Sequence, residues 1–141
     1  MQITIINGPN LNLLGVREPH IYGHTTFEEY LESLRLKFPE VTINYFQSNH
    51  EGALIDQIHI SGFESKGIII NAGAYSHTSY AIADAISAVP APVVEVHISN
   101  TFGRETFRHQ DVLSGRCAGC IVGLGLGGYE LALLHLMSLQ V

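Results

Sequence analysis

Polar and charged side chains gather in three stretches of the chain, each directly after a short apolar run. Tyrosine, histidine and arginine in such places can abstract a proton, return it, or hold an anion. A purely structural domain needs turn residues there, but it does not need two histidines and several arginines. The candidate side chains are Asn10, Arg17 and Tyr22 in the first stretch, Asn71 and His77 in the second, and His97, Ser99, Arg104 and Arg108 in the third.

Arg17 and Tyr22 lie in the segment 15–23, which has a glycine at each end. Such glycines suit the hinges of a mobile lid. A free tyrosine has a pKa of about 10 and is a weak base at neutral pH, but a nearby guanidinium lowers that pKa. The pair could therefore abstract a proton from a bound substrate. The alternative is a solvent-exposed loop that carries an aromatic residue by chance, and the residues alone leave both interpretations open.

His97 continues a buried apolar run, and the alternation of side chains along a strand puts it on the same face as Glu95. We therefore expect Glu95 to orient the imidazole. The residues that follow, 99–101, have the pattern of a helix cap, and a helix start also offers free N–H groups to a carboxylate. Taken alone, Asn10 and Asn71 would be turn-stabilising residues and His77 a loop histidine.

The chain alternates strands and helices five times, which predicts a parallel sheet with helices on both faces. We expect one α/β domain over residues 1–141, a flavodoxin-like three-layer sandwich with strand order 2-1-3-4-5. Ligands of such sheets bind beyond the carboxyl ends of the strands, where the three polar stretches meet. The strand patterns cover 3–6, 41–46, 67–71, 92–97 and 118–122; the helical patterns cover 25–38, 51–61, 78–89, 101–108 and 129–139.

Composition excludes several classes of protein. The net charge of −6, with only seven Lys and Arg, leaves no basic patch for nucleic acid. The apolar runs are too short to span a membrane, and the first seven residues are too short for a signal peptide. A chain with 46% hydrophobic residues suits a sheet covered on both faces and a large subunit interface. We therefore expect a cytoplasmic homo-oligomer.

Three motifs suggest chemistry that we do not expect. Residues 123–128 satisfy the G-x-G-x-x-G pattern, but no later strand could supply the acidic ribose ligand of a dinucleotide site, so we expect a tight turn. His20 and His24 lie in a loop without a third ligand, so we expect no metal and no cofactor. Cys117 and Cys120 form a C-x-x-C that we interpret as core or turn residues rather than a redox site.

Several sequence segments, distributed from residue 3 to about residue 136, together resemble one enzyme family. The segments 6–15, 17–19 and 22–23 are similar to the opening signature of type II 3-dehydroquinate dehydratases, and so are 71–79, 95–100, 104–108 and 123–129. The resemblance implies conversion of 3-dehydroquinate to 3-dehydroshikimate and water through an enolate, a step of the shikimate pathway and of quinate breakdown. A non-catalytic module that binds a small molecule or nucleotide is the alternative.

The resemblance also implies roles for individual residues. Tyr22 would take the proton, helped by Arg17, and Asn10 would stabilise the enolate through water. His97 would protonate the departing hydroxyl, with Glu95 and Arg104 as orienting groups. Asp84 would reach the site of a neighbouring subunit in trimers that assemble into a dodecamer. The residues implied to hold the substrate are Asn71, His77, Ile98, Ser99 and Arg108.

Overall fold

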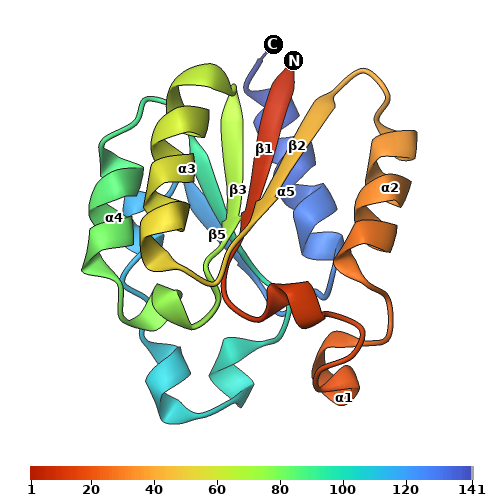
Figure 1. Ribbon diagram of the computed structural model, residues 1–141, viewed down its shortest axis with the longest axis vertical. Coiled ribbons are helices and arrows are strands. Elements are labelled where there is room, and N and C mark those ends of the chain that lie inside the picture. Colours follow the sequence, from red (N-terminus) through yellow and green to blue (C-terminus); the bar gives the residue numbers. More distant parts are fainter. Residues whose placement is uncertain (141) are drawn as a thin grey trace.

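The computed structural model describes residues 1–140, apart from the side chains of Ile21 and Tyr22. Its centre is a parallel sheet of five strands in the order β2-β1-β3-β4-β5, as the sequence predicts (Figure 1). Within the sheet, β1 lies between β2 and β3. The strand order therefore reverses its direction at β1, and this reversal creates the switch point expected for this fold. The strands are β1 (Gln2–Asn7), β2 (Thr42–Gln47), β3 (Gly67–Asn71), β4 (Val93–His97) and β5 (Gly119–Val122).

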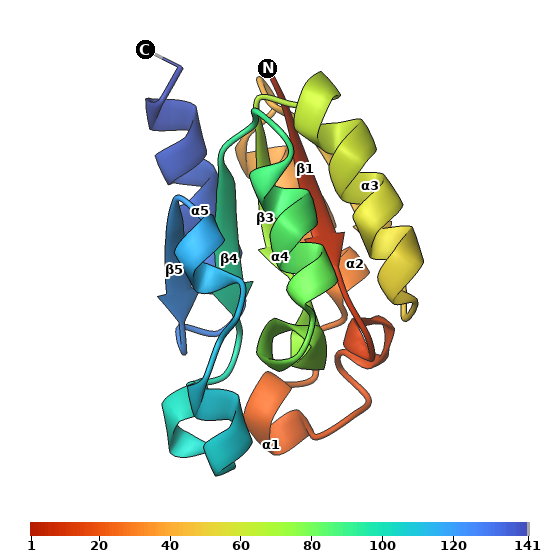
Figure 2. The same ribbon diagram turned by 90° about the vertical axis from the view of Figure 1, so that its left-hand side faces the viewer.

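Helices cover both faces of the sheet and enclose two hydrophobic cores (Figures 1 and 2). Alternate strand residues face opposite cores: Ile5 packs with the core under α2 and α5, whereas Ile6 packs with the core under α3 and α4. The helices are α2 (Phe27–Lys37), α3 (Glu51–Glu64), α4 (Tyr80–Ser87) and α5 (Gly127–Ser138). None of the described helices has the length and apolar character that crossing a membrane would require.

Short helical turns crowd the edge where the strands end, at the bottom of Figures 1 and 2. The segment 15–23, expected as a loop, contains the four-residue helix α1, because Pro19 presets its first turn and Gly23, at φ 79°, ends it. The remaining turns are 3-10 helices: η1 (Leu11–Leu13), η2 (Gly73–His77), η3 (Thr101–Gly103), η4 (Thr106–His109) and η5 (Ser114–Arg116).

Several predicted boundaries are wrong for local reasons. The helix expected at 78–89 is shorter: α4 starts at Tyr80, because Ser79 caps it by accepting a hydrogen bond from the Ile82 N–H at 3.0 Å, and it ends at Ser87. The helix expected at 101–108 is two 3-10 turns, separated by the extended backbone of Arg104. The last helix starts at Gly127, two residues earlier than expected.

The helix expected at 51–61 does not end before Gly62; α3 continues to Glu64. Gly62 is buried, and a Cβ atom there would lie 2.2 Å from the Cβ of Val89. The glycine therefore serves the close approach of α3 to the segment that follows α4, not the termination of the helix.

Candidate active site

A cavity opens at the carboxyl ends of β1, β3 and β4, and its volume is about 670 Å³ including space open to solvent. Three segments distant in sequence supply the walls, because the parallel strands end at one edge of the sheet. The structure brings nine of the predicted residues together there: Asn10, Arg17, Asn71, His77, His97, Ile98, Ser99, Arg104 and Arg108.

Glu95, predicted to orient His97, is not among the described lining residues, and neither are Tyr22 and Asp84. Tyr22 is the last residue of α1, and its side chain lies outside the described part of the structure. Asp84 lies on α4 with 77% of its side chain exposed, and its carboxylate is 3.6 Å from the guanidinium of Arg116. Within a single chain Asp84 therefore does not line the cavity.

Three of the seven basic residues of the chain, Arg17, Arg104 and Arg108, line this one cavity. Arg104 donates a hydrogen bond to the Ser99 hydroxyl at 3.2 Å and lies 3.8 Å from Glu18. Against a net charge of −6, such a concentration of guanidinium groups makes the cavity locally attractive to an anion.

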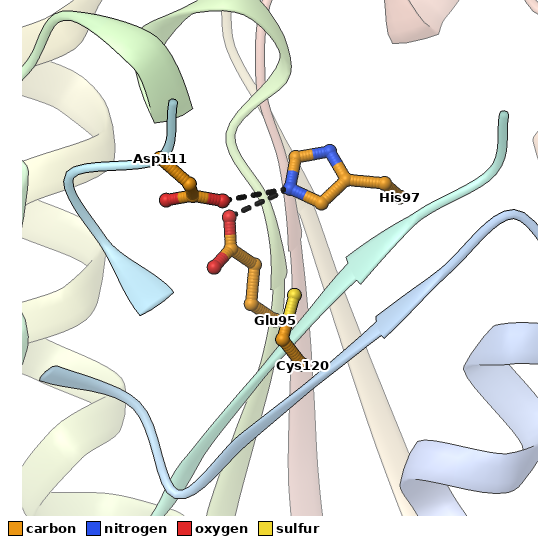
Figure 3. Close-up of side chains that lie close together, drawn as sticks. All are labelled: Glu95, His97, Asp111 and Cys120. Atoms are coloured by element: carbon orange, nitrogen blue, oxygen red, sulfur yellow. Dashed lines mark hydrogen bonds and ion pairs between the residues drawn. The ribbon is translucent and has the colours of Figure 1, made fainter. Parts of the chain in front are cut away.

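His97 is buried beside two carboxylates, as Figure 3 shows. Its Nε2 lies 2.6 Å from Oε2 of Glu95 and 3.3 Å from Oδ2 of Asp111. The Glu95 contact confirms the shared strand face expected from alternation. Because a carboxylate accepts hydrogen bonds, both contacts favour an imidazole with a proton on Nε2.

The charges of this cluster follow from burial and hydrogen bonding. Burial alone would lower the pKa of His97, but its hydrogen bonds to Asp111 and Glu95 outweigh burial and raise the pKa to about 9. Burial raises the pKa of Glu95, whose side chain is fully enclosed. The pKa of Asp111 is lowered despite burial, because His97, Glu95 and the backbone N–H of Leu113 hydrogen-bond to its carboxylate. His97 is therefore a cation at neutral pH and Asp111 an anion.

His77 stacks beside His97, with ring centres 6.3 Å apart and planes inclined by 25°. Its Nδ1 lies 2.7 Å from the carbonyl oxygen of Gln110, which can only accept. This contact requires a proton on Nδ1 and leaves the opposite nitrogen, Nε2, for a ligand in the cavity.

Asn71 is held by a buried network under the cavity floor. Its amide donates to the Tyr129 hydroxyl at 3.0 Å, and that hydroxyl donates to Asn7 at 2.8 Å. The side-chain oxygen of Asn71, Oδ1, accepts a hydrogen bond from the Gly73 N–H at 3.2 Å. These contacts fix the side chain before a ligand arrives, which reduces the entropy lost on binding.

Comparison with known proteins fits this geometry. Residues 1–137 match the family model described as dehydroquinase class II. The chain belongs to this family. A 3-dehydroquinate dehydratase of Exiguobacterium is 56% identical over 139 residues, which cover 98% of this chain and 95% of the relative. A catabolic 3-dehydroquinase of Emericella nidulans is 51% identical, over 94% of this chain and 88% of the relative.

Solved structures of type II dehydroquinases share the fold. The enzyme of Butyrivibrio crossotus superposes with a TM-score of 0.94 at 47% identity, covering 97% of both chains. That of Propionibacterium acnes gives 0.92 at 44% identity, over 97% of this chain and 96% of that one. The family and the sheet order expected from the sequence are thus confirmed.

The glycine-rich segment forms a tight turn between β5 and α5, as expected: residues 123–126 make the turn, and Gly127 and Gly128 begin α5. Gly123 has φ 87°, and a Cβ atom there would lie 3.0 Å from the Cβ of Asn100. Gly128 is buried, and a Cβ atom on it would lie within 3.3 Å of Val96 and Ile121. These glycines serve close packing between β5, α5 and the end of β4.

Asp111 and Cys120 also belong to the His97 cluster, and neither was expected there: no sequence pattern points to Asp111, and Cys120, interpreted as a core or turn residue, is an exposed residue of β5. Each of these side chains offers an atom that could bind a metal ion, and these atoms of Glu95, His97, Asp111 and Cys120 lie within 4.8 Å of one another. The Nε2–Oε2 separation of 2.6 Å is a hydrogen bond, whereas two ligands of a tetrahedral zinc stay about 3.3 Å apart. Partial burial of the thiol and the nearby Glu95 carboxyl raise the pKa of Cys120 to about 12, so the thiol is neutral. We therefore interpret the group as an acid–base cluster.

Proposed function

We propose that this chain removes water from 3-dehydroquinate to give 3-dehydroshikimate, as a hydro-lyase of the shikimate pathway. The names of its relatives in the dehydroquinase class II family support this substrate. One observation carries the mechanism: a buried imidazole, His97, within hydrogen-bond distance of two carboxylates, shares a cavity with three arginines. An anionic substrate would be held by the guanidinium groups next to an acid able to protonate a leaving hydroxyl.

The first step is proton abstraction. The phenolate of Tyr22 takes a proton from the ring carbon beside the ketone, and the C–H electron pair forms an enolate. Arg17, which lines the cavity five residues earlier in the chain, favours the phenolate form. Asn10 stabilises the enolate oxygen through a water molecule.

The second step is loss of the hydroxyl. The enolate electrons form the new double bond as the C–O bond breaks, and the imidazolium of His97 gives its proton to the departing hydroxyl, which leaves as water. The ketone is restored and is now conjugated with the double bond. The enzyme returns to its starting state when Tyr22 releases its proton to solvent and His97 takes up a proton from solvent.

The substrate is held by groups that already line the cavity. The backbone N–H groups of Ile98 and Ser99, together with the Ser99 hydroxyl, bind the carboxylate. Asn71, His77 and Arg108 bind the remaining oxygens, and the fixed orientations of Asn71 and His77 support this assignment.

We further propose a cytoplasmic homo-oligomer, trimers assembled into a dodecamer, in which Asp84 reaches the site of a neighbouring subunit. Large apolar side chains are exposed on the isolated chain, among them Leu36 at 82% and Tyr80 at 73%. Tyr80 lies on α4 with Asp84, so an interface over this helix would cover both.

Substitution of Tyr22 by Phe tests the assigned base. Tyr22→Phe should lower kcat by about 10²-fold or more, because the base is lost, while product binding is retained. Steady-state kinetics and calorimetric titration with 3-dehydroshikimate measure the two quantities. An unchanged kcat would remove Tyr22 from the mechanism.

A further inference from the structure

Asp111 has no part in the steps above, yet it contacts the proposed acid directly. Its Oδ2 lies 3.3 Å from Nε2 of His97, on the side of the ring that also faces Glu95 (Figure 3). Asp111 comes from the segment between η4 and η5, whereas Glu95 and His97 come from β4. A second carboxylate therefore reaches the same nitrogen from a separate element.

The local backbone fixes how Asp111 points. Its other oxygen, Oδ1, accepts hydrogen bonds from the N–H groups of Leu113 at 2.7 Å and Ser114 at 3.0 Å. These two bonds leave Oδ2 directed at His97. The Ser114 hydroxyl donates to Oε1 of Glu95 at 3.0 Å, so one residue braces both carboxylates.

The two carboxylates are not equivalent. Glu95 is fully enclosed, and placing a negative charge there is costly, especially beside a second carboxylate. Asp111 keeps 19% of its side chain exposed and has two backbone N–H donors, so it is the better site for the charge that balances an imidazolium. Nδ1 lies on the opposite side of the ring, away from both carboxylates (Figure 3).

Other titratable and charged groups around His97 do not take over this role. The Cys120 thiol of β5 is neutral, and the neighbouring His77 carries no negative charge. The other charged groups among the described lining residues are the cations Arg17, Arg104 and Arg108, which disfavour a further positive charge. Among the side chains that the structure describes around His97, the carboxylates of Glu95 and Asp111 are the groups that can stabilise the imidazolium.

We propose that Asp111 is a positioning residue for the dehydration: it supplies the negative charge that keeps His97 protonated, and it holds the ring with Nδ1–H available to the leaving hydroxyl. The inference rests on the proposed function, in which His97 is the general acid. It predicts that removal of the Asp111 charge changes the pH range of activity, and not only its level.

Asp111→Asn is a sharp test because the backbone dictates the orientation of the amide. Leu113 and Ser114 require an acceptor, so the amide oxygen takes the place of Oδ1 and the NH₂ group faces Nε2 of His97. A donor then opposes a donor, and the imidazolium is destabilised. The alkaline limb of kcat/KM, expected near pH 9 in the wild type, should move down by about one unit or more.

Titration of the His97 imidazole by NMR gives a readout independent of catalysis. In Asp111→Asn its pKa should fall in parallel with the alkaline limb, while activity near pH 6 stays closer to wild type. Asp111→Glu should restore part of the shift because it restores the charge. Asp56→Asn, which removes an exposed carboxylate on α3, is the matched control and should leave both quantities unchanged.

An unchanged His97 titration in Asp111→Asn, or an equal loss of kcat/KM at every pH, would overturn the proposal. If Asp111→Asn does not fold, Asp111→Ser repeats the test, since its hydroxyl still accepts one backbone N–H without a charge. A wild-type protein without dehydratase activity would instead reject the proposed function, even where the NMR shift is observed.

Discussion

His97 shows how the neighbours of one side chain set its chemistry. The ring is buried, which alone would favour the neutral form, but Asp111 and Glu95 raise its pKa to about 9. An imidazole in this setting is an acid at neutral pH, and that suits protonation of a hydroxyl better than removal of a proton. The base must then be another group, and the proposed mechanism assigns that role to Tyr22.

At the residue scale, Arg108→Ala should weaken substrate binding more than it slows the chemical step. Arg108 lines the cavity, but it is assigned to hold substrate oxygens and not to transfer protons. We expect KM to rise about tenfold or more with a smaller change in kcat, because a charge-assisted hydrogen bond contributes about 1.5–3 kcal/mol. Lys66→Ala, which removes an exposed charge outside the cavity, is the control for steady-state kinetics. A fall in kcat alone would assign Arg108 to the transition state instead.

The sequence predicts the site where simple periodicity or motif resemblance applies. Alternation along β4 placed Glu95 beside His97, and the ends of three strands located the cavity. Asp111 could not be found this way, because it follows His97 by fourteen residues of turns whose path depends on tertiary packing. The spacing between Asp111 and Ser114 predicts a local turn, but it does not predict contact with His97. The network of Asn7, Asn71 and Tyr129 likewise joins residues up to 122 positions apart.

At the element scale, five strand–helix units fixed the topology, because each buried face needs a partner and crossovers are right-handed. Boundaries were harder. The helical pattern at 25–38 begins two residues too early, because α2 starts at Phe27 and is capped by Thr26, whose hydroxyl accepts a hydrogen bond from the Glu29 N–H at 3.2 Å. The predicted end of α3 before Gly62 was wrong, because the sequence around Gly62 contains no sign that the distant Val89 packs against it.

Two glycines of α3 give a matched test of that packing. Gly62→Ala should lower the free energy of unfolding by about 1–3 kcal/mol, because its Cβ would overlap Val89. Gly52→Ala, in the same helix with nothing within 4 Å, should leave stability unchanged or raise it by up to about 1 kcal/mol. Urea denaturation measures both variants. Equal stabilities would mean that α3 can shift away from Val89 at no cost.

At the scale of the whole molecule, the proposed shared site predicts complementation between two defective chains. Asp84→Ala and His97→Ala should each have low activity alone. Asp84→Ala removes a residue from the site of the neighbouring subunit, and His97→Ala removes one from the site of its own chain. In oligomers co-assembled from both, about a quarter of the sites in a random mixture receive both native residues. Activity of the tagged, co-purified mixture should therefore exceed that of either variant. No recovery in a verified mixture would place Asp84 outside the neighbouring site.

The most direct test of the central claim is a dehydratase assay on the purified wild-type chain. Chelator-treated protein is added to 3-dehydroquinate, and the ultraviolet absorbance of the conjugated product is followed, with and without borohydride. Lys37 pairs with Glu130 at 2.6 Å and, like Lys66, does not line the cavity, so no lysine is placed to form a Schiff base. We predict rapid turnover that survives both treatments. A well-folded protein with no turnover, or with turnover that borohydride abolishes, would contradict the account.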